Sequence, residues 1–322
     1  MTDMTFLIVP RNVLLVLLAC FSIKSHAGSY AYITNQGADS VSVIDLSTNH
    51  VIKNIQVGKA PVGVAISNKL GLAYISNVDG QSISVIDIKS NSVIKTLPIH
   101  GSPVGLAVSS DNRTLYVADW TDDRIIAIDT ADNSLQQEIK IGKAPAGMVV
   151  SPDSRTLYIA CRDSNDVVAI DTRSFKIKNR IAVGRHPFGI SLSPDGKSLF
   201  VVNVLSNTVT IIDTDTMEND SIKVGAHPYC ISISSNGKTA YVTDTQDDDV
   251  SVLDLTQKKV IATIPVGEVP EGISFEAKST HVYVTNWGSN SVSVIDSGSN
   301  QKIMEIPTGD KSRAFGEFIS GE

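Results

Sequence analysis

The chain repeats itself seven times with a period of forty-two residues, or forty-one in one copy, and this periodicity constrains its fold more than any other feature. Each copy contains Tyr-Val-Thr-Asn or a variant, and the aromatic residues that open these segments are Tyr32, Tyr74, Tyr116, Tyr158, Phe200, Tyr241 and Tyr283. The aspartates of Val-Ile-Asp or its variants keep the same spacing, at Asp45, Asp87, Asp129, Asp171, Asp213, Asp254 and Asp296. Such a period is typical of arrays in which each repeat is one supersecondary unit that packs on its neighbours.

Each repeat contains four short segments with the composition of β-strands. In the second copy they cover residues 63–67, 72–76, 82–86 and 92–96. The segments are rich in β-branched residues, and the residues between them favour turns. No segment has the apolar spacing of a long amphipathic helix. Because four-stranded units repeated around an axis are propeller blades, we expect an all-β fold, a single seven-bladed β-propeller of four-stranded antiparallel blades.

The two ends of the chain complement each other. The segment that starts at Ser29 has the pattern of a second strand with no first strand before it, and residues 313–320 have the pattern of a first strand with no second strand after it. We therefore expect the C-terminal strand to join the N-terminal blade and close the ring, which would remove exposed strand edges. The predicted propeller domain covers residues 28–322.

These repeats resemble the YVTN family of β-propeller repeats, known from bacterial and archaeal surface and periplasmic proteins. The resemblance covers residues 29–320 and implies the fold and an exported setting, with a function that is often undefined. The Trp-Asp and Gly-His landmarks of WD-repeat propellers are missing. The repeated tryptophan motifs of quinoprotein propellers are missing too, since the chain contains only Trp120 and Trp287. Related architectures include lactonases and the virginiamycin B lyase, so the resemblance leaves an enzyme open.

The N-terminal residues 1–27 have the pattern of a signal peptide. Arg11 precedes an apolar run over residues 13–23, which is too short to span a bilayer. Small residues at Ser25 and Ala27 predict cleavage after Ala27. An alternative is a lipoprotein anchored at Cys20, because residues 17–20 resemble a lipobox. Both interpretations place the mature protein in the periplasm or at the cell surface, and no other segment is a transmembrane candidate.

Composition narrows the possible partners. The formal net charge is −7 and no basic stripe is present, which argues against nucleic acid and anionic membrane surfaces as partners. Cys161 and Cys230 fall in repeats two apart, so we expect no disulfide between them. We also predict no metal site, no cofactor and a monomer, although the acidic segments 119–123, 163–166 and 247–249 leave calcium binding open.

The candidate ligand site comes from comparing the repeats at the positions that flank a proline shared by six copies and replaced by Ser312 in the seventh. Three consecutive copies carry small or aliphatic residues there, whereas the next four carry the set His186, Phe188, His227, Tyr229, Glu271, Lys311 and Arg313. We expect this set to form one side of the rim of the channel mouth. Two cations beside one carboxylate, with two aromatic rings, favour a small anionic ligand that is partly aromatic. The alternative is that Glu271 and Arg313 form a salt bridge on the rim.

Trp120 and Trp287 follow the repeat tyrosine by four positions, and we expect them to be exposed on loops as a partner surface. No nucleophile elbow, phosphate-binding loop or zinc-protease motif occurs in the chain. The sequence therefore favours an exported, non-catalytic binding or protein-interaction scaffold with its ligand or partner surface at the channel mouth. The alternative is a small-molecule enzyme, similar to a lactonase or lyase, that uses the His186 and His227 side of the rim with Glu271.

Overall fold

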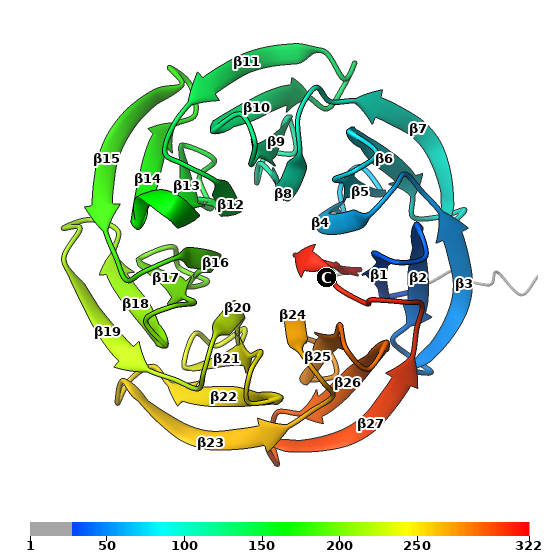
Figure 1. Ribbon diagram of the computed structural model, residues 1–322, viewed down its shortest axis with the longest axis vertical. Coiled ribbons are helices and arrows are strands. Elements are labelled where there is room, and N and C mark those ends of the chain that lie inside the picture. Colours follow the sequence, from blue (N-terminus) through cyan, green and yellow to red (C-terminus); the bar gives the residue numbers. More distant parts are fainter. Residues whose placement is uncertain (1–27, 322) are drawn as a thin grey trace, which may run out of the picture.

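A computed structural model describes residues 28–321 and shows seven four-stranded blades around a central axis (Figure 1). The predicted seven-bladed propeller is therefore confirmed. The predicted signal peptide and Cys20 lie outside the described residues. Within each blade the first strand is innermost and the fourth is outermost, and neighbouring strands are antiparallel.

The blades are numbered from the N-terminus. Blade 1 contains β1 (Tyr30–Asn35), β2 (Ser40–Asp45), β3 (His50–Gln56) and β29 (Ile319–Ser320). Blade 2 contains β4 (Pro61–Ser67), β5 (Leu72–Asn77), β6 (Ser82–Asp87) and β7 (Ser92–Pro98). Blade 3 contains β8 (Pro103–Val108), β9 (Thr114–Asp119), β10 (Arg124–Asp129) and β11 (Leu135–Lys140). Blade 4 contains β12 (Pro145–Val150), β13 (Thr156–Cys161), the short 3₁₀ turn η1 (Arg162–Ser164), β14 (Asp166–Asp171) and β15 (Lys176–Ala182).

The remaining blades follow the same order. Blade 5 contains β16 (Pro187–Leu192), β17 (Ser198–Asn203), β18 (Thr208–Asp213) and β19 (Asn219–Lys223). Blade 6 contains β20 (Pro228–Ile233), β21 (Thr239–Asp244), β22 (Asp249–Asp254) and β23 (Lys259–Pro265). Blade 7 contains β24 (Pro270–Glu276), β25 (His281–Asn286), β26 (Ser291–Asp296) and β27 (Gln301–Pro307).

The C-terminal segment closes the ring, as the sequence predicts. Ser320 pairs with Tyr30 in an antiparallel ladder, and the N–H of Arg313 donates to the carbonyl of Thr34 at 2.8 Å. The segment is not one continuous strand, however. At β28 (Phe315–Gly316) it pairs in parallel with β4 of blade 2 before it returns to blade 1. Gly316 has a φ of 110°, which a side chain would disfavour, and this allows the detour toward the axis.

In four of the seven copies the repeated motif links one blade to the next. The hydroxyl at the third position of the motif donates to a carbonyl at the start of the following blade: Thr34 to Val62 at 3.1 Å, and Ser76 to Val104 at 2.8 Å. These hydroxyls and carbonyls are buried, so each bond satisfies groups that would otherwise lose water without compensation. These bonds therefore help to fix four of the blades against the blades that follow them.

Candidate functional site

The residues that follow the repeat proline meet at the axis and close one end of the channel. Phe188 is only 3% exposed, and its ring centroid lies 4.3 Å from that of Tyr229 and 4.7 Å from that of Phe315. Equivalent residues of blades 2 to 4 belong to the same apolar cluster. We call the residues that meet at the axis the axial plug. It consists of Val62, Val104, Ala146, Phe188, Tyr229, Glu271, Arg313 and Phe315. Phe188, which was expected at the rim of the channel mouth, therefore packs against the neighbouring rings across the axis.

Arg313 is held inside the plug by three neighbours. It forms an ion pair with Glu271, donates to the hydroxyl of Tyr229 at 2.6 Å and donates to Oε1 of Gln36 at 3.3 Å. The side chains of Arg313 and Glu271 are 19% and 11% exposed. Burial raises the pKa of Glu271, although the charge of Arg313 opposes that shift. The structure thus contains the salt bridge that the sequence left as an alternative, and the guanidinium is occupied by protein groups.

The other members of the predicted set surround the plug without joining one pocket. His186 is half-buried, and its Nε2 lies 4.0 Å from Oδ1 of Asp163. Lys311 is exposed, and its ammonium lies 5.3 Å from the ring centroid of Trp287. Within residues 28–321, no hydrogen bond or ion pair joins the imidazoles of His186 and His227. Phe188, Tyr229, Glu271 and Arg313 therefore come together, whereas the two histidines and Lys311 remain at the periphery.

Asx residues at the turns between second and third strands set the position of both histidines. Asn165 has a φ of 57°, and its Oδ1 accepts the backbone N–H of His186 at 2.9 Å. Asn207 accepts the N–H of His227 in the same way at 3.1 Å. Asparagine tolerates the left-handed conformation better than most residues, which explains why the repeat places Asx residues there.

The two tryptophans are half-buried, which corrects the expectation that they are exposed. The ring of Trp120 lies 5.9 Å from that of Phe188 and is covered by the guanidinium of Arg162 at 5.2 Å. The indole N–H of Trp287 donates to Gln36 at 3.2 Å. Both rings support the plug and its surroundings, which reduces the surface that they offer to a partner.

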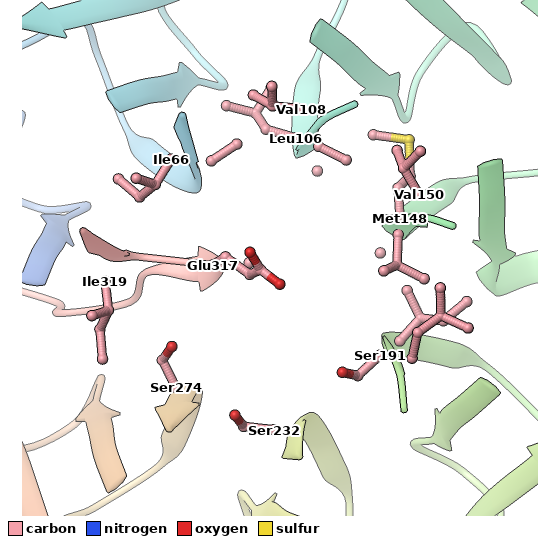
Figure 2. A pocket seen from close by; sticks show the side chains of 18 of the residues that line it. Ile66, Leu106, Val108, Met148, Val150, Ser191, Ser232, Ser274, Glu317 and Ile319 are labelled. Atoms are coloured by element: carbon pink, nitrogen blue, oxygen red, sulfur yellow. The ribbon is translucent and has the colours of Figure 1, made fainter. Parts of the chain in front are cut away.

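The channel is hollow beyond the plug. A cavity of about 590 Å³ extends from Phe315 to the loops at the far ends of the inner strands. Blades 2 to 4 contribute Ile66, Leu106, Val108, Met148 and Val150 to its wall (Figure 2). Blades 5 to 7 contribute the hydroxyls of Ser191, Ser232 and Ser274, and the carboxylate of Glu317 points toward the centre (Figure 2). Further apolar residues complete the lining, together with the polar loop residues Asn68, Lys69, Ser109, Ser110 and Asn112 of blades 2 and 3. We call this space the channel cavity.

Sequence reasoning missed the channel cavity as a site. The three serines occupy a position that is small in every repeat, which by itself indicates only crowding around the axis. The sequence does contain one signal for this site, because the residue at that repeat position changes between copies. It is Ala65, Ala107 and Val149 in three consecutive copies and serine in the next three. Glu317 gave no repeat signal, because the last copy departs from the pattern after Gly316.

Neither cysteine forms a disulfide: Cys161 and Cys230 are both free and buried. Burial raises the pKa of the Cys161 thiol to about 12. Across residues 28–321, no group of three His, Cys, Asp or Glu side chains is arranged to hold a metal ion. The same part of the chain contains no helix long and apolar enough to cross a membrane.

Two families match parts of the sequence. Residues 88–179 match the family described as lactonase, 7-bladed beta-propeller, and residues 154–225 match the family described as YNCE-like beta-propeller. Each match covers less than half of the chain, and together with the seven blades they are consistent with a YVTN-type propeller. No curated protein matches the sequence.

Several solved structures share the fold. A chain of Kuenenia stuttgartiensis hydrazine synthase is 24% identical, with a TM-score of 0.76 over 83% of this chain and 92% of that chain. A functionally unknown protein from Desulfotomaculum acetoxidans is 17% identical, with a TM-score of 0.77 over 89% and 99%. The dihydro-heme d1 dehydrogenase NirN in complex with DHE is 18% identical, with a TM-score of 0.67 over 86% of this chain and 63% of that chain. At these identities the similarity is one of fold.

Proposed function

We propose that the protein is an exported, non-catalytic binding scaffold that holds a small amphipathic molecule in the channel cavity. The observation that carries this proposal is the mixed lining of the cavity. Apolar side chains such as Met148 and Val150 face the same space as the serine hydroxyls and Glu317. The volume of about 590 Å³ is within the range of small-molecule sites.

The chemistry of the wall defines the ligand class. An apolar ring or short chain placed against Met148 and its neighbours would gain about 25 cal/mol per Å² of apolar surface removed from water. The serine hydroxyls either donate or accept hydrogen bonds, and the carboxylate of Glu317 accepts them. Beside Glu317 an amine on an apolar body fits best, a neutral alcohol fits less well, and a carboxylate is disfavoured by the charge of Glu317; Lys69 lies in the loop between β4 and β5, at another part of the lining.

The anionic ligand predicted from the sequence would bind at the opposite end, near the plug. Arg313 is the group suited to an anion, but its guanidinium already contacts Glu271 and Tyr229. An anion would have to displace a buried carboxylate to reach it. The apolar side chains and serines of the channel cavity already face the space that a ligand would occupy.

The alternative, a lactonase-like enzyme, is supported by the family match over residues 88–179. That match includes neither His186 nor His227, and neither histidine lines the channel cavity. Among residues 28–321, no histidine would therefore lie beside a substrate in the cavity to act as acid or base.

The test uses three compounds with one apolar body: cyclohexylmethylamine, cyclohexylmethanol and cyclohexanecarboxylate. Calorimetry on the purified protein should show binding in the order amine, alcohol, carboxylate. Glu317→Gln should weaken the amine about tenfold and leave the alcohol unchanged, because only the amine loses a charged partner. The control Asp310→Asn removes an exposed charge at the plug end and should change neither affinity.

Two results would contradict the proposal. One is binding of the amine that Glu317→Gln leaves unchanged while His186→Ala abolishes it. The other is turnover of a lactone panel that His227→Ala eliminates, which would establish the enzyme instead.

A further inference from the structure

A hydrogen-bonded amide closes the end of the second strand in most blades. In blade 1, Nδ2 of Asn35 donates to the hydroxyls of Ser40 and Ser42 on the third strand, at 3.1 and 2.9 Å. The asparagines of blades 2, 5 and 7 make the same pair of bonds. The repeat therefore places a donor on the second strand opposite hydroxyl acceptors on the third.

Two blades carry an acid at one of these positions and supply a cation. In blade 3, Asp119 replaces the asparagine, and Nε of Arg124 directly opposite donates to it at 2.9 Å. In blade 4, Asp166 occupies the third-strand position, and Arg180 on the fourth strand pairs with it at 3.1 Å. Each buried or half-buried carboxylate at this place is thus matched by a donor.

Blade 6 has acids at both positions and no cation paired with them. Asp244 and Asp249 are directly opposite each other in the β21–β22 ladder. In blade 4, Arg180 of the fourth strand pairs with the residue two positions after Asp166. In blade 6 the equivalent fourth-strand residue, which pairs with the residue two positions after Asp249, is Thr263. Among the described residues, neither aspartate takes part in an ion pair.

Asp244 is buried, Asp249 is half-buried, and both carboxylates are short of donors. Asp244 is 0% exposed, and its Oδ2 accepts a hydrogen bond from Ser251 at 2.6 Å. Oδ1 of Asp244 and Oδ1 of Asp249 are both buried without a partner. Two ionised carboxylates in this arrangement would repel each other and leave buried oxygens unsatisfied.

The charged surroundings are acidic on most sides. Asp247 and Asp248 precede the third strand in the same turn, and the loop that packs on Asp248 carries Glu268. The loop that packs on Asp244 carries His227. Burial is the main cause that raises the pKa of Asp244 to about 7 and that of Asp249 to about 6, with the neighbouring aspartates adding to both shifts.

We propose that Asp244 and Asp249 bind one proton between them, that this proton supplies the donor missing from blade 6, and that its loss loosens the end of this blade beneath the plug. The protonated carboxyl donates to its partner and so replaces the amide of the other blades. A divalent cation is a poorer occupant, because the residues described here include no third acidic or imidazole ligand in a suitable position.

The pair is mechanically connected to the plug. Gly225 lies so close to Asp244 that a Cβ atom there would come within 2.5 Å of its carboxylate carbon. The following residues are tied to the turn of the pair, since the N–H of Thr245 donates to the carbonyl of His227 at 3.1 Å. This loop leads directly to Tyr229 of the plug. Repulsion between the two carboxylates would therefore act on the loop that positions Tyr229.

The direction of the pH effect follows from the raised pKa values. An aspartate in the unfolded chain loses its proton near pH 4, roughly its ordinary pKa. The folded pair keeps its proton until pH rises through about 6 to 7. Between the unfolded and the folded pKa, the folded state therefore binds more protons than the unfolded state. The stability contributed by the pair is complete below the unfolded pKa and is lost as the pH rises through the folded pKa.

The test gives blade 6 the Asn–Ser pair of blades 1, 2 and 7 through Asp244→Asn with Asp249→Ser. Urea unfolding of the full chain is measured from pH 5 to pH 8. Between these limits the folding equilibrium constant of the wild type should fall at least about tenfold more than that of the double variant. Asp215→Asn, which removes an exposed charge, should retain the wild-type dependence.

A second variant and a direct titration keep the proposal testable if the double variant fails to fold. Asp249→Arg copies the Asp119–Arg124 pair of blade 3 and should also flatten the pH dependence. Carbon-13 NMR of the aspartate carboxyls should show a group that titrates between pH 5 and 8. Equal pH dependence in all variants, no such titration, or stabilisation of the wild type by calcium that the variants lose would each overturn the shared proton.

Discussion

At the residue scale, Arg313 decides how the axial plug is held together. Its guanidinium joins Glu271 of blade 7, Tyr229 of blade 6 and Gln36 of blade 1, so one side chain from the closing segment contacts three blades. A largely buried ion pair adds little net stability compared with apolar groups, but removal of one partner leaves the other charge uncompensated. A single substitution of Arg313 should therefore lower the stability of the protein by more than its contacts alone suggest.

Arg313→Ala should destabilise the protein by about 3 kcal/mol, because Glu271 stays buried without its cation. Urea unfolding at neutral pH measures the loss. Lys311→Ala is the matched control: it removes an exposed cation beside Trp287 and should cost less than about 1 kcal/mol. Combining Arg313→Met with Glu271→Leu should recover most of the stability, and an equal loss in the single and double variants would contradict this role for the ion pair.

The same residues show what sequence comparison reaches at this scale. The repeats singled out Phe188, Tyr229, Glu271 and Arg313 because they depart from their counterparts, and the structure brings these four together. Their burial could not be read from the repeats, because it depends on the distance across the axis. That distance is fixed by the number and packing of the blades, and by Phe315 arriving from the far end of the chain.

At the element scale, the closing segment is the least regular part of the ring. The pattern predicted its pairing with the first blade, which Ser320 and Tyr30 confirm. It did not predict the division into β28, which pairs with blade 2, and β29, which pairs with blade 1. A first-strand pattern does not indicate that part of the segment pairs with the neighbouring blade. Gly316 was the position where such a departure was possible, since its φ of 110° disfavours any side chain.

Deletion of residues 312–322 should remove much of the stability of the ring. Phe315 and Phe318 are buried at 4% and 0% exposure. Their loss alone would cost about 3–6 kcal/mol, and β1 would be left with an unpaired edge. We expect aggregation or a large decrease in melting temperature. Deletion of residues 321–322 alone retains β29 and serves as the control; a chain ending at Lys311 that melts like the wild type would disprove closure by this segment.

At the scale of the whole molecule, one end of the axis is filled with side chains and the other is hollow. One end is filled by the plug, and the other opens through the channel cavity with its apolar residues, serines and Glu317. The sequence predicted the number of blades, their strands and the closure of the ring from periodicity. It did not predict which end is hollow, because the lining residues obey the same small-and-large alternation as the scaffold. Export and the monomeric state stay predictions.

A crystal structure of the protein soaked with cyclohexylmethylamine would show directly whether the channel cavity is the binding site. We expect the ligand inside the channel cavity, with its ring against Met148 and Val150 and its ammonium within hydrogen-bonding distance of Glu317 or one of the three serines. Crystals of Glu317→Gln soaked in the same way should show weaker occupancy at that place. A ligand found only at the plug end, beside His186 and His227, would contradict the account and restore the rim as the binding site.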